Sequence, residues 1–235
     1  MPVTPIVTCE HCKQRCDGKS LGRYPRQQYY AVGENQEAII LKLIQSNAKG
    51  LLTCQKSAMW GEAHSKPDLE LRSIGQPSKI VGRLEVKHIR RAWMQVGKCL
   101  EEGGLVPWET IAVNTAKIRR YAKLYEQEGI PIHLVWRIDR ACLPGRFFYQ
   151  DIGALTDIVE RHGNKREFVR EGDDGDKTAF HYSVNELKPF NVDEYLDLLF
   201  TLSRTVEQKS WIVSDKQDYP EYEFTDDDVP PEHWY

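Results

Sequence analysis

The sequence predicts an α/β fold in which helices flank a mixed central sheet, with a small cysteine-rich knuckle at the N-terminal side. Helical periodicity is followed by three segments of alternating apolar and polar residues, a second helical segment and a strongly apolar strand. The 235 residues, 40% of them hydrophobic, are enough for one α/β domain with a small appendage. Three of the six cysteines fall within eight residues.

The first half of the core is expected to be one helix and three strands. Apolar residues recur at helical spacing over residues 33–48, and Gly50 follows as a stop signal. The strands that we expect next cover residues 51–56, 67–74 and 79–89.

The second half begins with a helix over residues 114–128, for which Asn114 is the expected N-cap and Gly129 the end. Its expected buried stripe contains Ile118, Tyr121, Ala122 and Tyr125. The apolar segment 130–138 reads as a buried strand. We expect after it a strand near 146–150, a short helix near 154–162, two polar strands and a helix over 192–208.

The charge of the chain is unevenly distributed. The formal net charge is −3, but residues 214–235 hold eight acids and one base, so the rest of the chain carries about +4. A basic body with an acidic tail is compatible with a polyanionic partner. The resulting division is a cysteine-rich knuckle at 1–28, a core at 29–160, further strands and a helix at 161–213, and a disordered acidic tail at 214–235.

Nothing in the sequence suggests a membrane segment or secretion. Apolar runs stay short of the roughly eighteen residues that a spanning helix needs. The residues that follow Met1 lack the basic and apolar regions of a signal peptide. We therefore expect an intracellular, cytoplasmic protein with no membrane contact.

The hairpin formed by 67–74 and 79–89 carries the chemistry. If its turn is centred between Gln76 and Pro77, Asp68 lies directly opposite Glu85, with the Cβ atoms about 5 Å apart. The two-residue period of a strand places Lys87 on the same face as Glu85. Two facing carboxylates repel unless a cation lies between them, so a divalent metal explains the arrangement. The alternative is a solvated hairpin face whose charges keep the sheet soluble.

The pattern Pro67-Asp68, sixteen residues, then Glu85-Val86-Lys87 resembles the signature of the PD-(D/E)XK nuclease superfamily, which has the restriction-endonuclease-like fold. The order of helix, three strands, helix and strand around it matches that core over roughly residues 29–160. The resemblance implies that Asp68 and Glu85 hold Mg²⁺ or Mn²⁺, that the Val86 carbonyl is a further ligand, and that Lys87 orients or deprotonates the attacking water.

Glu37 is a further candidate acid. It extends the apolar stripe of the first helix, and many superfamily members carry an acid on that helix. Equally, it is a first-turn acid favoured by the helix dipole.

Basic residues near the hairpin and on the second helix are candidates for phosphate contacts, although each is also compatible with a solvated surface. In recombination-type relatives a glutamine precedes a tyrosine by four residues on this helix, whereas Lys117 precedes Tyr121 here. The candidate nucleic-acid contacts are Arg83, Arg90, Arg91, Lys117 and Arg120.

The cluster Cys9-x2-Cys12-x3-Cys16 offers three soft ligands for a structural Zn²⁺. Candidates for the fourth ligand are Cys54, which we favour, His11 and His64. Free thiols and an iron–sulfur cluster remain alternatives. Cys99 and Cys142 read as ordinary buried thiols.

The sequence thus predicts a metal-dependent nuclease that hydrolyses phosphodiester bonds in DNA rather than RNA, with either endonuclease or exonuclease action. A homodimer is compatible with the resemblance, because cutting both strands needs two sites. The competing hypothesis is a non-catalytic module that keeps the nuclease fold and binds nucleic acid or protein. A metalloenzyme acting on small molecules has no glycine-rich phosphate loop or dinucleotide fingerprint to support it.

Overall fold

The structure is a computed structural model in which residues 8–13, 26–48, 50–57, 66–74, 78–140, 142–170, 177–199 and 201 are described. Cys16, His64, residues 75–77, where the sequence predicts a turn, and the acidic segment 214–235 lie outside these residues. Among the residues described, no helix has both the length and the apolar character needed to cross a membrane.

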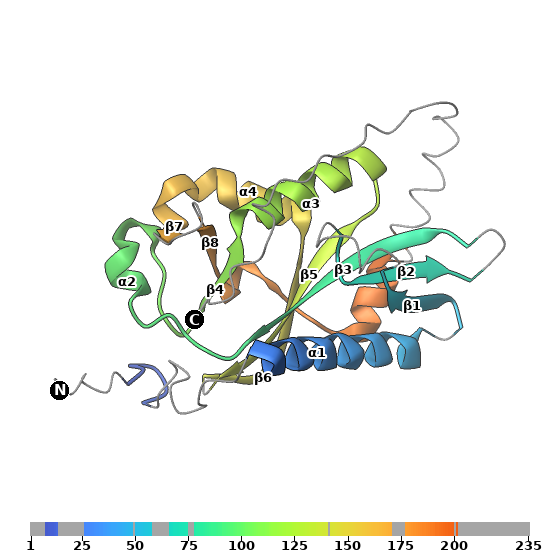
Figure 1. Cartoon of the computed structure of the whole chain (residues 1–235), viewed down its shortest axis with the longest axis horizontal. Helices are drawn as coiled ribbons and strands as arrows, with labels where there is room; N and C mark the ends of the chain where they lie inside the picture. Colours follow the sequence, from blue (N-terminus) through green and yellow to red (C-terminus); the bar gives the residue numbers. More distant parts are fainter. Residues whose placement is uncertain are drawn as a thin grey trace.

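A six-stranded central sheet organises the molecule (Figure 1). Its strands follow the order β1-β2-β3-β5-β6-β9. The sheet is mixed, because β3 and β5 pair in parallel whereas the other neighbours are antiparallel. The strands are β1 (Leu52–Lys56), β2 (Leu69–Ser73), β3 (Ile80–Ile89), β5 (Ile132–Arg140), β6 (Leu143–Asp151) and β9 (Lys188–Pro189).

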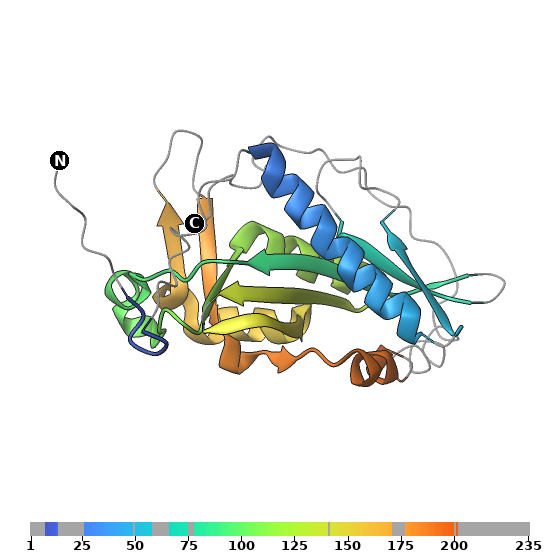
Figure 2. The ribbon, with the colours of Figure 1, turned by 90° about the horizontal axis from the view of Figure 1, so that it is seen from below.

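Helices cover both faces of this sheet, as the two views in Figures 1 and 2 show. On one face, α1 (Arg26–Asn47) and the helical residues 192–199 enclose a core with side chains of β1, β2 and β3. On the other face, α3 (Thr115–Glu128) and α4 (Ile152–His162) pack on inward-facing residues of β5. A short helix, α2 (Val96–Cys99), follows β3.

A second sheet was only partly foreseen. It has the order β4-β8-β7, with β4 (Thr110–Asn114), β7 (Glu167–Arg170) and β8 (Lys177–Ser183). The last two are the polar strands expected from the sequence, whereas β4 is not among the expected strands. Apolar side chains of β4 and β8 join the core under α3 and α4, so this small sheet extends that layer.

The predicted α/β fold with a mixed sheet flanked by helices is confirmed. The first helix begins earlier than expected, at Arg26. The ends of the second helix are as predicted: the Asn114 side chain accepts a hydrogen bond from the amide of Lys117, and Gly129 adopts the left-handed conformation with φ 67°.

The hairpin register is also as predicted. Leu69 pairs with Leu84, and the same register continued by one residue places Asp68 across from Glu85. A shift in register occurs only towards the turn, between Leu71 and Arg72. Because Leu69 and Leu84 point into the core under α1, their neighbours Asp68 and Glu85 are directed to the α3 side of the sheet.

Candidate metal centre and active site

Glu85 lies at the centre of the site and is fully buried. It belongs to β3, an interior strand paired with β2 on one side and β5 on the other. Its neighbours Leu84 and Val86 contribute to the core under α1, so alternation along the strand turns Glu85 towards α3. A carboxylate in this position must be compensated by charge or hydrogen bonds.

Three side chains provide that compensation. The ammonium groups of Lys87 and Lys117 both contact Oε1 of Glu85, with Lys117 Nζ at 2.6 Å. The hydroxyl of Tyr121 donates a hydrogen bond to Oε2, at 2.5 Å. Lys117 and Tyr121 are four residues apart on α3 and therefore project from one face of the helix.

These contacts set the charge state of Glu85. Burial acts to raise its pKa, but the charges of Lys117 and Lys87 outweigh burial and hold the pKa at about 2. Burial acts to lower the pKa of Lys87, yet the negative charges of Glu85 and Asp68 raise it. The pKa of Lys117 is lowered, chiefly by burial. Glu85 is thus an ionised carboxylate held in a buried position.

Asp68, just before β2, is the second acid. Asp68 and Glu85 with the side chains that contact them are called the acidic site. Oδ2 of Asp68 accepts a hydrogen bond from the amide of Val86, at 2.7 Å. Burial, followed by the charge of Glu85, raises the pKa of Asp68 to about 7. The two facing carboxylates repel each other, and this repulsion is what a bound cation relieves.

The residues present fit a hard divalent cation. Carboxylate and carbonyl oxygens are the donors that Mg²⁺ and Mn²⁺ prefer. A strand residue directs its N–H and C=O to the same side, so the carbonyl of Val86 is directed towards Asp68 together with its amide. Asp68, Glu85 and Val86 therefore form a donor set suited to such an ion.

Glu37 lies at the edge of the acidic site. It is buried on α1, with its Oε2 3.4 Å from Nζ of Lys56. Burial raises the pKa of Glu37, and the charge of Glu85 is a smaller contribution in the same direction. The described contacts pair Glu37 with β1.

Arg83 does not lie where a nucleic-acid contact requires it. Its side chain is 2% exposed, with one guanidinium nitrogen 2.6 Å from Glu128 and another 3.8 Å from Glu70. This prediction is corrected: β3 is an interior strand, so Arg83 is enclosed and serves as the partner of two acids. Of the other candidates, Lys117 lies inside the acidic site, whereas Arg90, Arg91 and Arg120 are partly exposed.

The expected zinc ligands are only partly brought together. Cys9 and Cys12 lie beside Cys142, with the three sulfur atoms within 4.8 Å of one another. Cys54, expected as the fourth ligand, is instead buried in the core under α1. Burial in this core raises the pKa of the Cys54 thiol to about 12.

Two residues at the acidic site were not recognised as such from the sequence. The sequence predicts Lys117 as a phosphate contact and Tyr121 as a core residue, although both contact Glu85. The four-residue spacing between them was a usable signal, because it placed both on the face of α3 that covers β3. For Cys142 the sequence carried no signal, since only the turn between β5 and β6 brings it to Cys9.

Comparison with solved structures finds similar folds. No family model matches the chain, and no curated protein matches it. The structure of Hjc, a Holliday junction resolvase from Archaeoglobus fulgidus, is similar with a TM-score of 0.38 and 10% identity, covering 70% of this chain and 95% of that one. The structure of D212, a nuclease from a fusselovirus, is similar with a TM-score of 0.46 and 16% identity, covering 76% and 97%. Neither likeness bears on the side-chain geometry described above.

Proposed function

We propose that the chain is a metal-dependent nuclease that hydrolyses phosphodiester bonds in DNA. The observation that carries the proposal is the position of Asp68, just before β2, opposite Glu85 on β3, together with two lysines at Glu85. Asp68, Glu85 and the Val86 carbonyl would hold Mg²⁺ or Mn²⁺. Such an ion, when bound, offsets negative charge on a phosphate and lowers the pKa of a water molecule.

The chain's own residues position the reactants. Lys87 is partly exposed and stays protonated beside Glu85, so its ammonium group can orient a water molecule and offset the charge of a scissile phosphate. Lys117 and Tyr121 hold the Glu85 carboxylate in one orientation. Fixed ligands of this kind reduce the reorganisation that the reaction needs.

One observation favours a second candidate, a non-catalytic module that binds nucleic acid or protein. Both oxygens of Glu85 already have partners, and two ammonium groups offset its charge. A site of this kind is stable without a metal, as a nuclease fold that has lost catalysis would require. The two candidates differ in whether the site turns over substrate.

The test uses plasmid, linear and branched DNA with Mg²⁺ or Mn²⁺. We expect cleavage by the native chain and a loss of about 10²-fold or more for Asp68→Asn and Glu85→Gln, because metal-assisted charge stabilisation contributes several kcal/mol. Glu126→Gln, an exposed acid on α3, is the matched control and should cleave normally. Salt-sensitive DNA binding without any metal-dependent cleavage would instead establish the binding module. Matching RNA substrates measure the preference for DNA.

A further inference from the structure

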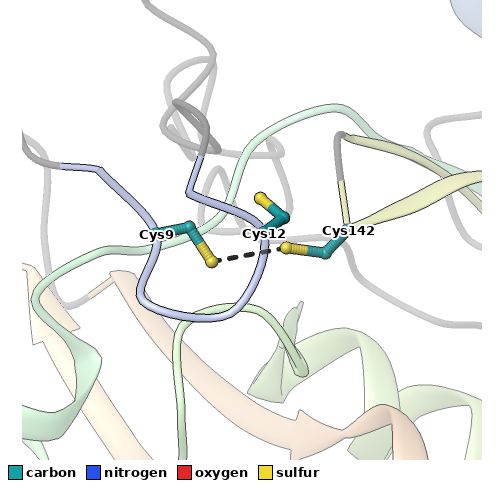
Figure 3. A group of neighbouring side chains, drawn as sticks. All are labelled: Cys9, Cys12 and Cys142. Carbon is teal, nitrogen blue, oxygen red and sulfur yellow. Dashed lines mark hydrogen bonds between the residues drawn. The ribbon is translucent and has the colours of Figure 1, made fainter.

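Three sulfur atoms from distant parts of the sequence meet at one end of the central sheet (Figure 3). Cys9 and Cys12 belong to the segment 8–13, and Cys142 lies beside the turn between β5 and β6. The sulfurs of Cys9 and Cys142 are 3.4 Å apart, and all three lie within 4.8 Å of one another. This cysteine cluster is separate from the acidic site on β3.

The separations suit ligands of one tetrahedral ion. With zinc–sulfur bonds of about 2.3 Å, tetrahedral geometry places two ligand sulfurs about 3.8 Å apart. A disulfide would need about 2.05 Å, and none joins the five described cysteines. In a cubane iron–sulfur cluster each cysteine binds a different iron, which spreads the sulfurs more widely than the ligands of a single ion.

Both sides of the cluster are held in place by the fold. The buried guanidinium of Arg140, two residues before Cys142, donates to the carbonyls of Trp108 at 2.7 Å and Thr110 at 2.9 Å. On the other side, the amide of Lys13 donates to the carbonyl of Cys9 at 2.9 Å. This tight turn holds Lys13 at φ 58°, a left-handed conformation that residues other than glycine rarely adopt.

The surroundings favour a soft metal. Cys9 is fully buried, and Ala92, Met94 and Trp108 pack around the cluster. The ring of His11 stacks on Trp108 with centroids 5.8 Å apart. Among the described residues the donor set is therefore three sulfurs, which selects zinc over magnesium or calcium.

We propose that Cys9, Cys12 and Cys142 bind one Zn²⁺, which fastens the N-terminal segment 8–13 to the turn between β5 and β6. The residues that pack against the cluster include Ala92 and Met94, which lie in the segment between β3 and α2. The ion would thus fix the chain immediately after the strand that carries Glu85. The site has three thiolates from the described chain and a fourth position for one further ligand.

The first test is metal analysis of full-length protein that has been purified under reducing conditions without chelator. We expect about one zinc per chain in the native protein and little in Cys12→Ser and Cys142→Ser. Cys99→Ser, at an exposed cysteine outside the cluster, and Cys54→Ala should retain the zinc. Loss of zinc in Cys54→Ala but not in Cys142→Ser would overturn the proposed ligand set, as would iron in place of zinc.

A second measurement avoids variants that fail to fold. The native protein is alkylated before and after removal of metal by a chelator, and the modified cysteines are identified by mass spectrometry. We expect Cys9, Cys12 and Cys142 to react only after chelation, whereas Cys99 reacts in both samples. Equal reactivity in both samples, or a Cys9–Cys142 disulfide in reduced protein that contains no metal, would overturn the proposal.

Discussion

Lys117 on α3 and Glu85 on β3, 32 residues apart in sequence, meet with Nζ 2.6 Å from Oε1. This contact connects the helix above the sheet to the acid that the hairpin positions. It also places a positive charge where a divalent cation would compete for the same oxygen. The contact therefore links stability and metal binding in one pair of residues.

Replacing Lys117 should move these two properties in opposite directions. In Lys117→Met the buried Glu85 loses one of its charged partners, and we expect the free energy of unfolding without metal to fall by about 1–3 kcal/mol. The rise in melting temperature on adding Mg²⁺ should exceed that of the native chain, because less positive charge opposes the ion. Arg119→Met, at an exposed position of the same helix, is the control. An unchanged response to Mg²⁺ would show that Lys117 and the ion do not compete.

Tyr121 offers a smaller change at the same carboxylate. Tyr121→Phe removes the hydroxyl that donates to Oε2 of Glu85, and hydrogen bonds to charged groups contribute about 1.5–3 kcal/mol. We expect a loss of that size in denaturant unfolding. Tyr125→Phe, at a tyrosine that is 42% exposed on the same helix, should unfold like the native chain. Equal stability of the two variants would exclude a structural contribution from the hydroxyl.

Two buried histidines predict a pH dependence of stability. Burial lowers the pKa of His133 and of His181 to about 4 from the usual 6.5. Between these values each histidine binds more protons in the unfolded chain than in the folded one, so the stability that it contributes is complete above pH 6.5 and is lost as the pH decreases towards 4. The raised pKa of Asp68 acts in the opposite direction over this range. The slope is about 1.4 kcal/mol per pH unit for each histidine.

Variants at these positions isolate the histidine contribution. His133→Asn keeps a polar group near the Tyr195 hydroxyl, which lies 3.1 Å from Nδ1 of His133. His181→Asn likewise keeps a donor for the Arg166 carbonyl. Each variant should show a shallower decline in unfolding free energy between pH 6.5 and 4. A decline as steep as that of the native chain would rule out these two histidines as its source.

The remaining basic candidates predict the salt dependence of DNA binding. Removing the charge of a base that contacts a phosphate lowers the magnitude of the slope of log affinity against log salt by about 1. We expect this change for Arg90→Gln, Arg91→Gln and Arg120→Gln.

Arg83→Met should lose about 3–5 kcal/mol of stability, because Glu70 and Glu128 would lose a buried partner. In folded Arg83→Met protein the slope of log DNA affinity against log salt should stay unchanged. A slope of smaller magnitude would show that Arg83 contacts the nucleic acid.

Local sequence patterns predicted the core well. Alternation along 79–89 fixed the face of each β3 residue, and the turn position fixed the register that places Asp68 across from Glu85. Asn114 and Gly129 marked the ends of α3 because capping depends on nearby backbone groups. Short-range signals of this kind can be recognised from a single sequence.

Features that depend on tertiary pairing were predicted less well. The strand β4 is short and obtains its partner from β8, far along the chain. Arg83 looked like a surface base because its burial follows from strand order, which no local pattern encodes. Cys54 is expected to be a ligand and Cys142 a core thiol, whereas in the structure Cys142 lies beside Cys9 and Cys54 lies in the core. The reason is again tertiary, because the β5–β6 turn, and not β1, reaches the segment 8–13.

The most direct measurement is a crystal structure of the protein soaked with Mn²⁺, with anomalous diffraction used to locate the ion. The account predicts a peak within coordination distance of carboxylate oxygens of Asp68 and Glu85 and of the Val86 carbonyl, and its loss in Asp68→Asn. Native crystals that show no peak there at saturating Mn²⁺, with both lysines still on Glu85, would contradict the proposed metal centre.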